Sequence, residues 1–313
     1  QNKRVAMLSR RLGIQELPQR LDGEAFAEGD SGTKCVGNLG ERMAPCGPGA
    51  IRFRGGYATM SAALAAELPD GVLQLGCRVV SIAAGDCPGD ITLTYQEAAG
   101  DAEMTMHARQ VIMAMPPGVL ASSVTFAPPL PEKQWKKMAT TATWCGDWCK
   151  VVACFKTSFW RELGASGVCA TRGPISIWWE GGAGAELGEE TCALIGLGFG
   201  EACMVLANKE ESEIREYVIE RLGGIFGKQL VSSQLEAVHH KCWMLDPLTY
   251  ASSNKQQHIE YGHPLLRRPT DWGIHFAGTE TEDCNGHVEG AVTAGQRAAE
   301  EVIEALGLKT TSL

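Results

Sequence analysis

The sequence predicts an α/β fold, α+β in detail, in which a domain built from separated stretches of the chain receives an inserted second domain. Strand-like and helical patterns alternate in residues 51–125 and return in residues 237–313. Between them, residues 126–236 hold several strand-like segments and one strong amphipathic helix, as expected for a mixed-sheet domain. Residues 1–50 form a weakly patterned N-terminal part.

Composition excludes several classes of protein. The 313 residues are 44% hydrophobic and 21% charged, which is a globular balance, and the formal net charge of -9 argues against a nucleic-acid or anionic-membrane surface. No apolar run reaches the length of a transmembrane helix. The 12 cysteines are scattered without a CxxC pair, so we expect no metal site. Unpaired thiols favour an intracellular or organellar compartment.

The first third of the chain predicts one helix and then a region with little core. Val5, Leu8 and Leu12 have helical spacing, and Gly13 ends the pattern. Residues 22–50 are rich in glycine, so we expect them to contribute little to a core. "IRFRGGYATMSAALAAEL" then predicts a turn and an amphipathic helix with Met60, Leu64 and Leu68 on one face.

Most of the segments after this helix are strand-like. "GVLQLGCRVVSIAA" and "ITLTYQEA" alternate as strands do, and "EMTMHARQVIMAMPP" predicts two more. Residues 111–115 form a continuous apolar run, typical of a strand covered on both faces. "CKVVACFKTSFW", "PISIWWE" and "TCALIGLGFG" predict an antiparallel or mixed sheet, and "NKEESEIREYVIERLGGIFG" predicts an amphipathic helix.

The last stretch has the order strand, polar loop and small-residue helix. Residues 274–277 predict a buried strand, and a helix from about Val288 follows the turn at Asn285 and Gly286. Small side chains let a helix approach a sheet or a planar ligand closely, and the free amides at its N-terminus suit a ligand that gains negative charge. A tightly packed helix that binds nothing is the alternative.

These stretches resemble a known family. "GIHFAGTETE" followed by "NGHVEGAVTAGQRAAEEV" resembles the C-terminal flavin motif of the flavin-dependent amine oxidases, which include monoamine, polyamine and L-amino-acid oxidases. "FRGGYATMSAALAAEL", "LGCRVVSI", "QVIMAMPPGVL", "GDWCKVVACFKTSFWR" and "WMLDPLTYAS" resemble further segments of the family, in the family's order. The resemblance implies a Rossmann-like FAD-binding domain made of discontinuous segments and an inserted substrate domain.

The resemblance also implies roles for individual residues. The positions that match cofactor-binding residues are Val80, Trp243, Gly278, Thr279, Glu280, Gly286 and Val288. Val80 would lie against the adenine, and Val288 would direct its N–H at the N1–C2=O edge of the flavin. Lys150 matches the lysine that holds a water near flavin N5, where a buried ammonium would assist the reaction with oxygen. The alternatives are a surface lysine at 150 and a core tryptophan at 243.

The sequence departs from the family in three ways. No GxGxxG fingerprint with its ribose-binding acid is present, so the FAD domain is expected to be incomplete at its N-terminus. The stretch between Arg20 and Arg52 is shorter than in the family. The two aromatic residues that often frame the flavin correspond to Ser253 and His287, which we expect in the substrate pocket. Ser252 replaces the cysteine of covalent flavin attachment, so the FAD is expected to be noncovalent.

These observations support two hypotheses. The first is an FAD-dependent oxidase that transfers hydride from an amine or amino acid to flavin N5 and reduces O2 to H2O2, with Lys150 assisting. The second is a catalytically degenerate relative that serves as a structural or interaction subunit of a larger assembly. In either case a partner chain could complete the FAD domain. A nicotinamide dehydrogenase is disfavoured because the dinucleotide fingerprint is missing.

Overall fold

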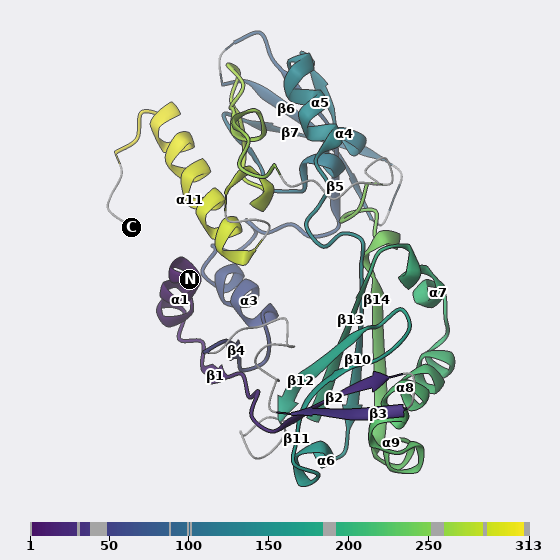
Figure 1. Ribbon diagram of the computed structural model, residues 1–313. Coiled ribbons are helices and arrows are strands. Elements are labelled where there is room, and N and C mark those ends of the chain that lie inside the picture. Colours follow the sequence, from purple (N-terminus) through teal and green to yellow (C-terminus); the bar gives the residue numbers. More distant parts are fainter. Residues whose placement is uncertain are drawn as a thin grey trace. The chain divides into compact units, whose positions relative to one another are not determined.

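The structure is a computed structural model that describes residues 2–29, 32–37, 49–87, 89–98, 100, 102–183, 192–251, 260–283 and 287–309. The chain forms two compact units (Figure 1). Unit 1 comprises Gln1–Leu12, Ala62–Gly146 and Asp246–Leu313, and unit 2 comprises Gly13–Ser61 and Asp147–Leu245. The chain therefore passes between the units at four points, the topology of an interrupted domain.

Unit 2 is built on a seven-stranded mixed sheet (Figure 1). In sheet order, its described strands are β14 (Leu235–Cys242), β10 (Trp148–Phe155), β13 (Cys192–Phe199), β12 (Ile177–Ala183), β11 (Ala165–Ala170), β2 (Glu24–Gly29) and β3 (Gly32–Gly37). The pairing of β11 with β2 is parallel, and the others are antiparallel. A mixed sheet was predicted for this part of the chain, and the prediction is confirmed.

Residues 22–50 were expected to add little to a core, and this expectation is wrong for their described part. The strands β2 and β3, dark purple in Figure 1, extend the sheet beyond β11. Ala25 is fully buried, and the ring of Phe26 packs edge-to-face on Phe226 with centroids 6.2 Å apart. Gly23 makes the approach possible, because it has φ +104 and a Cβ there would lie 2.9 Å from the Gly164 carbonyl oxygen.

One face of the sheet is covered by helices. Besides β1 (Glu16–Pro18) and β4 (Ile51–Phe53), which pair with each other, the remaining elements of unit 2 are α6 (Phe159–Glu162), η2 (Glu201–Cys203), α7 (Met204–Ala207), α8 (Glu211–Phe226), α9 (Lys228–Gln234) and η3 (Trp243–Leu245). The predicted amphipathic helix is α8: Ile214, Val218 and Leu222 are all fully buried in the unit's core. A capping box between Glu210 and Glu213 starts this helix.

Unit 1 contains two smaller sheets. The four-stranded sheet has the order β7 (Glu103–Ala108), β6 (Ile91–Glu97), β5 (Cys77–Ala84) and β9 (Thr125–Ala127), and β8 (Val111–Met113) pairs in parallel with β15 (Ile274–Phe276). The helical elements are α1 (Lys3–Arg11), α4 (Pro117–Ser123), α5 (Glu132–Thr140), α10 (Pro264–Arg267), η4 (Thr279–Thr281) and α11 (Val288–Ala305). The predicted α/β class is confirmed.

Two predicted apolar faces are not fully buried. In β8, Val111 and Met113 are buried but Ile112 is 39% exposed, because alternate side chains of a strand point to opposite faces and the second face is open. In α3 (Ala58–Ala66), Met60 is buried, whereas Leu64, and Leu68 beyond the helix, are exposed. This helix is mostly alanine, so its apolar residues do not form a distinct stripe.

A buried ion pair joins α6 to β12 in unit 2. The Glu180 side chain is fully buried, and its Oε2 accepts hydrogen bonds from Arg161 Nε at 2.7 Å and Trp160 Nε1 at 2.8 Å. Arg161 Nη1 also donates to the Asp22 carbonyl at 2.7 Å. The pair therefore connects the sheet to the segment that leads into β2.

Replacing Glu180 by alanine should lower the free energy of unfolding by about 3–5 kcal/mol, because the buried Arg161 would keep only the exposed Asp22 carboxylate, 3.5 Å away, as an ionic partner. Urea unfolding of the full chain measures the change. Glu216→Ala, at an exposed position on α8, is the control and should change stability by less than about 0.5 kcal/mol. Equal effects of the two substitutions would contradict this account.

Candidate functional site

The N-terminus of α11 is the centre of the candidate site. The chain leaves the buried strand β15, passes the extended residue Gly278 and then η4, and α11 starts at Val288. His287 is the N-cap residue, and its side chain makes no capping hydrogen bond. Its carbonyl accepts a hydrogen bond from Thr279 Oγ1 at 2.9 Å, which ties the helix start to η4. A hydrogen bond thus ties the start of this 18-residue helix to η4, and the side chain of its N-cap residue leaves the first helix amides uncapped.

The small residues of α11 divide between two faces. Gly290, Ala294 and Ala298 are buried, and the two alanines pack against Ala277, the residue that follows β15. Ala291 and Gly295 are exposed. Close packing therefore explains the small residues on the buried face of the helix. It does not explain the small residues on the exposed face.

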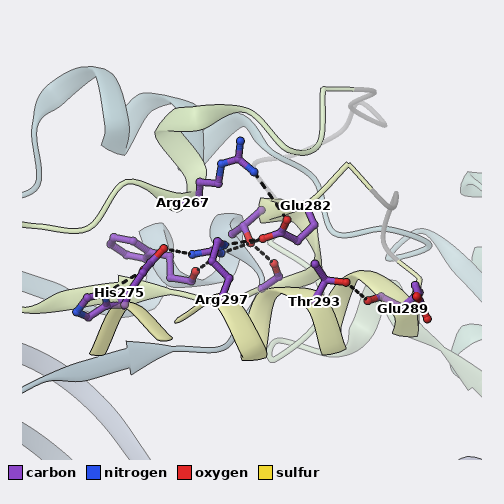
Figure 2. A network of polar contacts seen from close by, with 10 residues as sticks. Arg267, His275, Glu282, Glu289, Thr293 and Arg297 are labelled. Atoms are coloured by element: carbon purple, nitrogen blue, oxygen red, sulfur yellow. Dashed lines mark hydrogen bonds and ion pairs between the residues drawn. The ribbon is translucent and has the colours of Figure 1, made fainter. Parts of the chain in front are cut away.

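Arg297 fixes this helix to the strand and loop before it (Figure 2). Its Nε donates to Glu282 Oε1 and its Nη1 to Glu301 Oε1, both at 2.7 Å, and its Nη2 donates to the Phe276 carbonyl at 2.8 Å. Burial would lower the pKa of the guanidinium, but the hydrogen bonds with Glu282 and Glu301 outweigh it and raise the pKa. Arg297 therefore stays charged and holds β15, η4 and α11 together.

His275 extends this network into the strand. It is 4% exposed, and its Nδ1 lies 3.0 Å from Glu301 Oε2 while its Nε2 lies 3.0 Å from Gln110 Oε1. Figure 2 shows that Arg267 also approaches Glu282, with Nη1 3.7 Å from Oε2. The network was not predicted from the sequence; the available signal was the spacing of Arg297 and Glu301, which are one helical turn apart.

A second group that was not predicted from the sequence surrounds Glu280. This carboxylate is 2% exposed, and its Oε1 accepts a hydrogen bond from the Trp144 amide at 3.4 Å. Burial raises the pKa of Glu280, partly opposed by the backbone amides of Glu280 and Trp144. The Trp144 ring packs edge-on against His287, with centroids 5.7 Å apart, and against Tyr261 at 6.0 Å. Trp144 lies in a loop with no periodicity, so its place beside the helix start could not be predicted from the sequence.

Lys150 lies in the other unit, in the middle of β10. Its register partners are Leu197 on β13 and Lys241 on β14. The side chain is exposed, so the expected burial of this ammonium is not observed. Trp243, the first residue of η3, is half-buried, and Lys241 Nζ lies over its ring, 5.2 Å from the centroid.

A family model for flavin containing amine oxidoreductases matches residues 20–303. The chain belongs to this family. It is 32% identical to pig amine oxidase [flavin-containing] B over 216 residues, which cover 64% of this chain and 38% of that protein. It is 29% identical to a zebrafish (Danio rerio) amine oxidase [flavin-containing] over 265 residues, which cover 82% of this chain and 47% of that protein. The chain thus spans less than half the length of these relatives.

Solved structures of amine oxidases share the fold. A cyclohexylamine oxidase from Brevibacterium oxydans superposes with a TM-score of 0.76 at 17% identity, over 98% of this chain and 86% of that one. A putrescine oxidase bound to putrescine gives a TM-score of 0.75 at 17% identity, over 97% and 86% of the two chains. These likenesses support the amine oxidase architecture of the described elements.

The flavin that the family contains fits the N-terminus of α11. No side chain in the described part of the loop takes up the first helix amides, and Gly278 leaves no room for a side chain, because a Cβ there would lie 2.8 Å from the Met115 carbonyl oxygen. Val80 falls at a register shift in β5 and has no register partner on β6 or β9. Each feature suits close approach of a ligand to the backbone.

The predicted site residues fall into three groups. Gly278, Thr279, Glu280, His287 and Val288 come together around the helix start, and the last two are exposed. Val80 lies in the same unit on another sheet, whereas Lys150 and Trp243 belong to unit 2. The predicted positions Ser252, Ser253 and Gly286 lie outside the described residues.

The described residues give no sign of a metal site or of a membrane-spanning helix. Across these ranges no three His, Cys, Asp or Glu side chains are grouped so that they could hold a metal ion. Likewise, no helix within the described segments combines the length and apolar character that crossing a membrane requires.

Arg297→Ala should lower the free energy of unfolding by about 2–3 kcal/mol, because Glu282 and Glu301 would lose charged hydrogen-bond partners while partly buried. Denaturant unfolding is the measurement. Arg267→Ala is the matched control: its guanidinium is 38% exposed and approaches Glu282 only to 3.7 Å, so its loss should cost less than about 1 kcal/mol. A larger cost for the control would overturn the assignment of Arg297.

Glu280→Gln should make stability less sensitive to pH. Because the folded-state pKa of Glu280 is raised, the wild-type contribution is fully present below the unfolded pKa, about 4.3, and is lost as pH rises through the folded pKa. Glutamine does not ionise, so the variant does not lose this stability as the pH rises. The difference is about 1.4 kcal/mol for each pH unit by which the pKa of Glu280 is raised. Unfolding free energies from pH 4 to pH 8 test it. Parallel curves for the two proteins would refute the raised pKa.

Proposed function

We propose that the chain carries the flavin-facing and substrate-facing parts of an FAD-dependent oxidase that acts on an amine or amino acid. The observation that carries the proposal is the braced, uncapped N-terminus of α11, found in a chain of the flavin-containing amine oxidoreductase family. The glycine fingerprint for dinucleotides is not among these 313 residues, so we infer that polypeptide outside them, in the same or a partner chain, completes the FAD domain.

The residues of this chain would bind and orient the cofactor. The amides at the start of α11, that of Val288 first, would stabilise negative charge on the flavin edge, and Thr279 would keep the helix start in place through the His287 carbonyl. Gly278 would allow close backbone contact. When bound, FAD would supply acceptance of a hydride from the substrate carbon and reaction with O2 to give H2O2. We propose noncovalent binding, since Ser252 cannot form a thioether.

Lys150 would act in the reaction with oxygen. Its ammonium is exposed on β10 and makes no hydrogen bond or ion pair with other residues that the structure describes. A positive charge of this kind stabilises the charge that develops when O2 accepts an electron. The substrate imine, released into water, would hydrolyse without help from the protein.

An absorbance spectrum of the purified protein tests cofactor binding. We expect flavin bands near 450 nm, a property of the cofactor. After denaturation and filtration the flavin should pass through the membrane. A colourless protein that takes up no added FAD would favour a scaffold without catalysis, and flavin that remains on the denatured polypeptide would exclude noncovalent binding.

Lys150→Met should slow reoxidation of the reduced flavin by O2 about 100-fold, with little change in its reduction by substrate, because only the oxygen step uses the ammonium. Stopped-flow absorbance separates the two steps. Lys156→Met is the control, since this lysine follows the same strand and donates to the Ser233 carbonyl at 2.8 Å. Unchanged reoxidation in Lys150→Met would remove the residue from the mechanism.

A further inference from the structure

A tryptophan is held beside the start of α11. The centroid of the Trp144 ring lies 5.7 Å from that of the N-cap residue His287 and 6.0 Å from that of Tyr261. The Trp144 amide donates to Glu280 Oε1 at 3.4 Å, and Glu280 belongs to η4. The Tyr261 hydroxyl donates to the Ala142 carbonyl at 3.2 Å, two residues before Trp144. These residues all belong to unit 1, so one unit places the tryptophan next to the helix start.

The turn that carries Trp144 has a defined backbone. The Gly146 amide donates to the Thr143 carbonyl at 3.0 Å, which closes a β-turn over residues 143–146. Cys145, at the third position of the turn, has φ +56, in the left-handed region that residues other than glycine rarely adopt. A backbone angle of this kind persists only where the surrounding structure holds it. The direction in which the chain presents Trp144 is therefore fixed.

This turn leaves part of the tryptophan in contact with solvent. Trp144 is 40% exposed, and Val288, which follows its ring partner His287, is 42% exposed. The planes of the His287 and Tyr261 rings are inclined to the indole plane by 62° and 77°, so neither ring stacks flat on the indole. Because Trp144 is already oriented, a ligand that covers its exposed surface loses little side-chain entropy.

The ligand that suits this surface is a flat aromatic ring that gains negative charge along one edge. The first amides of α11 have no side-chain cap and favour negative charge. The indole beside them favours stacked or edge-on contact with a second ring. The isoalloxazine of a flavin has both properties, since it is a planar ring system whose N1–C2=O edge gains negative charge on reduction. A phosphate or a carboxylate would use the amides and leave the indole uncovered.

We propose that the Trp144 indole packs directly on the isoalloxazine of the bound flavin. The proposal rests on the proposed function, which places the flavin edge at the start of α11, and it adds a contact with the ring system itself. The indole would orient the ring and shield part of it from water. Trp144 lies outside the segments that resemble the family, so the motifs did not point to it.

Flavin fluorescence tests the contact without any turnover. An indole in contact with a flavin donates an electron to the excited ring and takes it back, which shortens the lifetime of the excited state. In the flavin-loaded protein, Trp144→Phe should therefore lengthen the fluorescence lifetime several-fold. The measurement is made in a Trp243→Phe background, because Trp243, a predicted cofactor-binding residue, would quench the flavin too. Trp135→Phe in the same background is the control: Trp135 is a 46% exposed tryptophan on α5 of the same unit, and its loss should leave the lifetime unchanged.

The affinity for FAD provides the second readout. Trp144→Leu should weaken the Kd of FAD about 3- to 10-fold, and Trp144→Phe, which keeps an aromatic ring, should restore most of the affinity. A lifetime that Trp144→Phe leaves unchanged would overturn the proposal, even with weaker FAD binding in Trp144→Leu, because the tryptophan would then only support the helix start. That result would leave the proposed function standing, whereas a protein that takes up no FAD would overturn both.

Discussion

The hydrogen bonds of Arg297 are the interaction on which the candidate site depends. One guanidinium joins the end of β15, the residue after η4 and the last turns of α11, and the two carboxylates keep it charged although it is partly buried. Gly278 follows the strand end where a side chain would not fit, and Thr279 holds the start of α11 through its hydrogen bond to the His287 carbonyl. We propose that the first amides of α11 are positioned in this way, because fixed donors stabilise developing charge without having to reorganise.

Unit 2 supplies a different kind of surface. Its helices bury one face of the sheet in a core of aliphatic, aromatic and thiol side chains. On the opposite face Lys150 and Phe199 are exposed, because alternate side chains of a strand point to opposite faces of the sheet. The ion pair between Arg161 and Glu180 joins α6 to β12, and Arg161 also bonds to the segment that leads into β2.

Much of the fold could be predicted from the sequence, and less of the site. The periodicity of α8 and the motif from β15 to α11 were strong local signals, and both elements formed where they were expected. The strand β2 was missed because its place depends on a glycine that fits against the backbone of a segment about 140 residues away. Trp144 was missed for the same reason, because its partner Glu280 is 136 residues away. For Arg297, only its spacing from Glu301 was a local signal, and its bonds to Glu282 and the Phe276 carbonyl depend on how the loop folds back.

The reduction potential of the bound flavin in Val288→Pro tests the central claim most directly. Proline is tolerated at the first position of a helix and removes only the Val288 N–H, and His287 already has the extended backbone that a following proline requires. The account predicts that the helix and the flavin are retained and that the midpoint potential falls by about 10–20 mV, as reduced flavin loses one stabilising amide. An unchanged potential in a folded, flavin-loaded variant would contradict the placement of the cofactor at the start of α11.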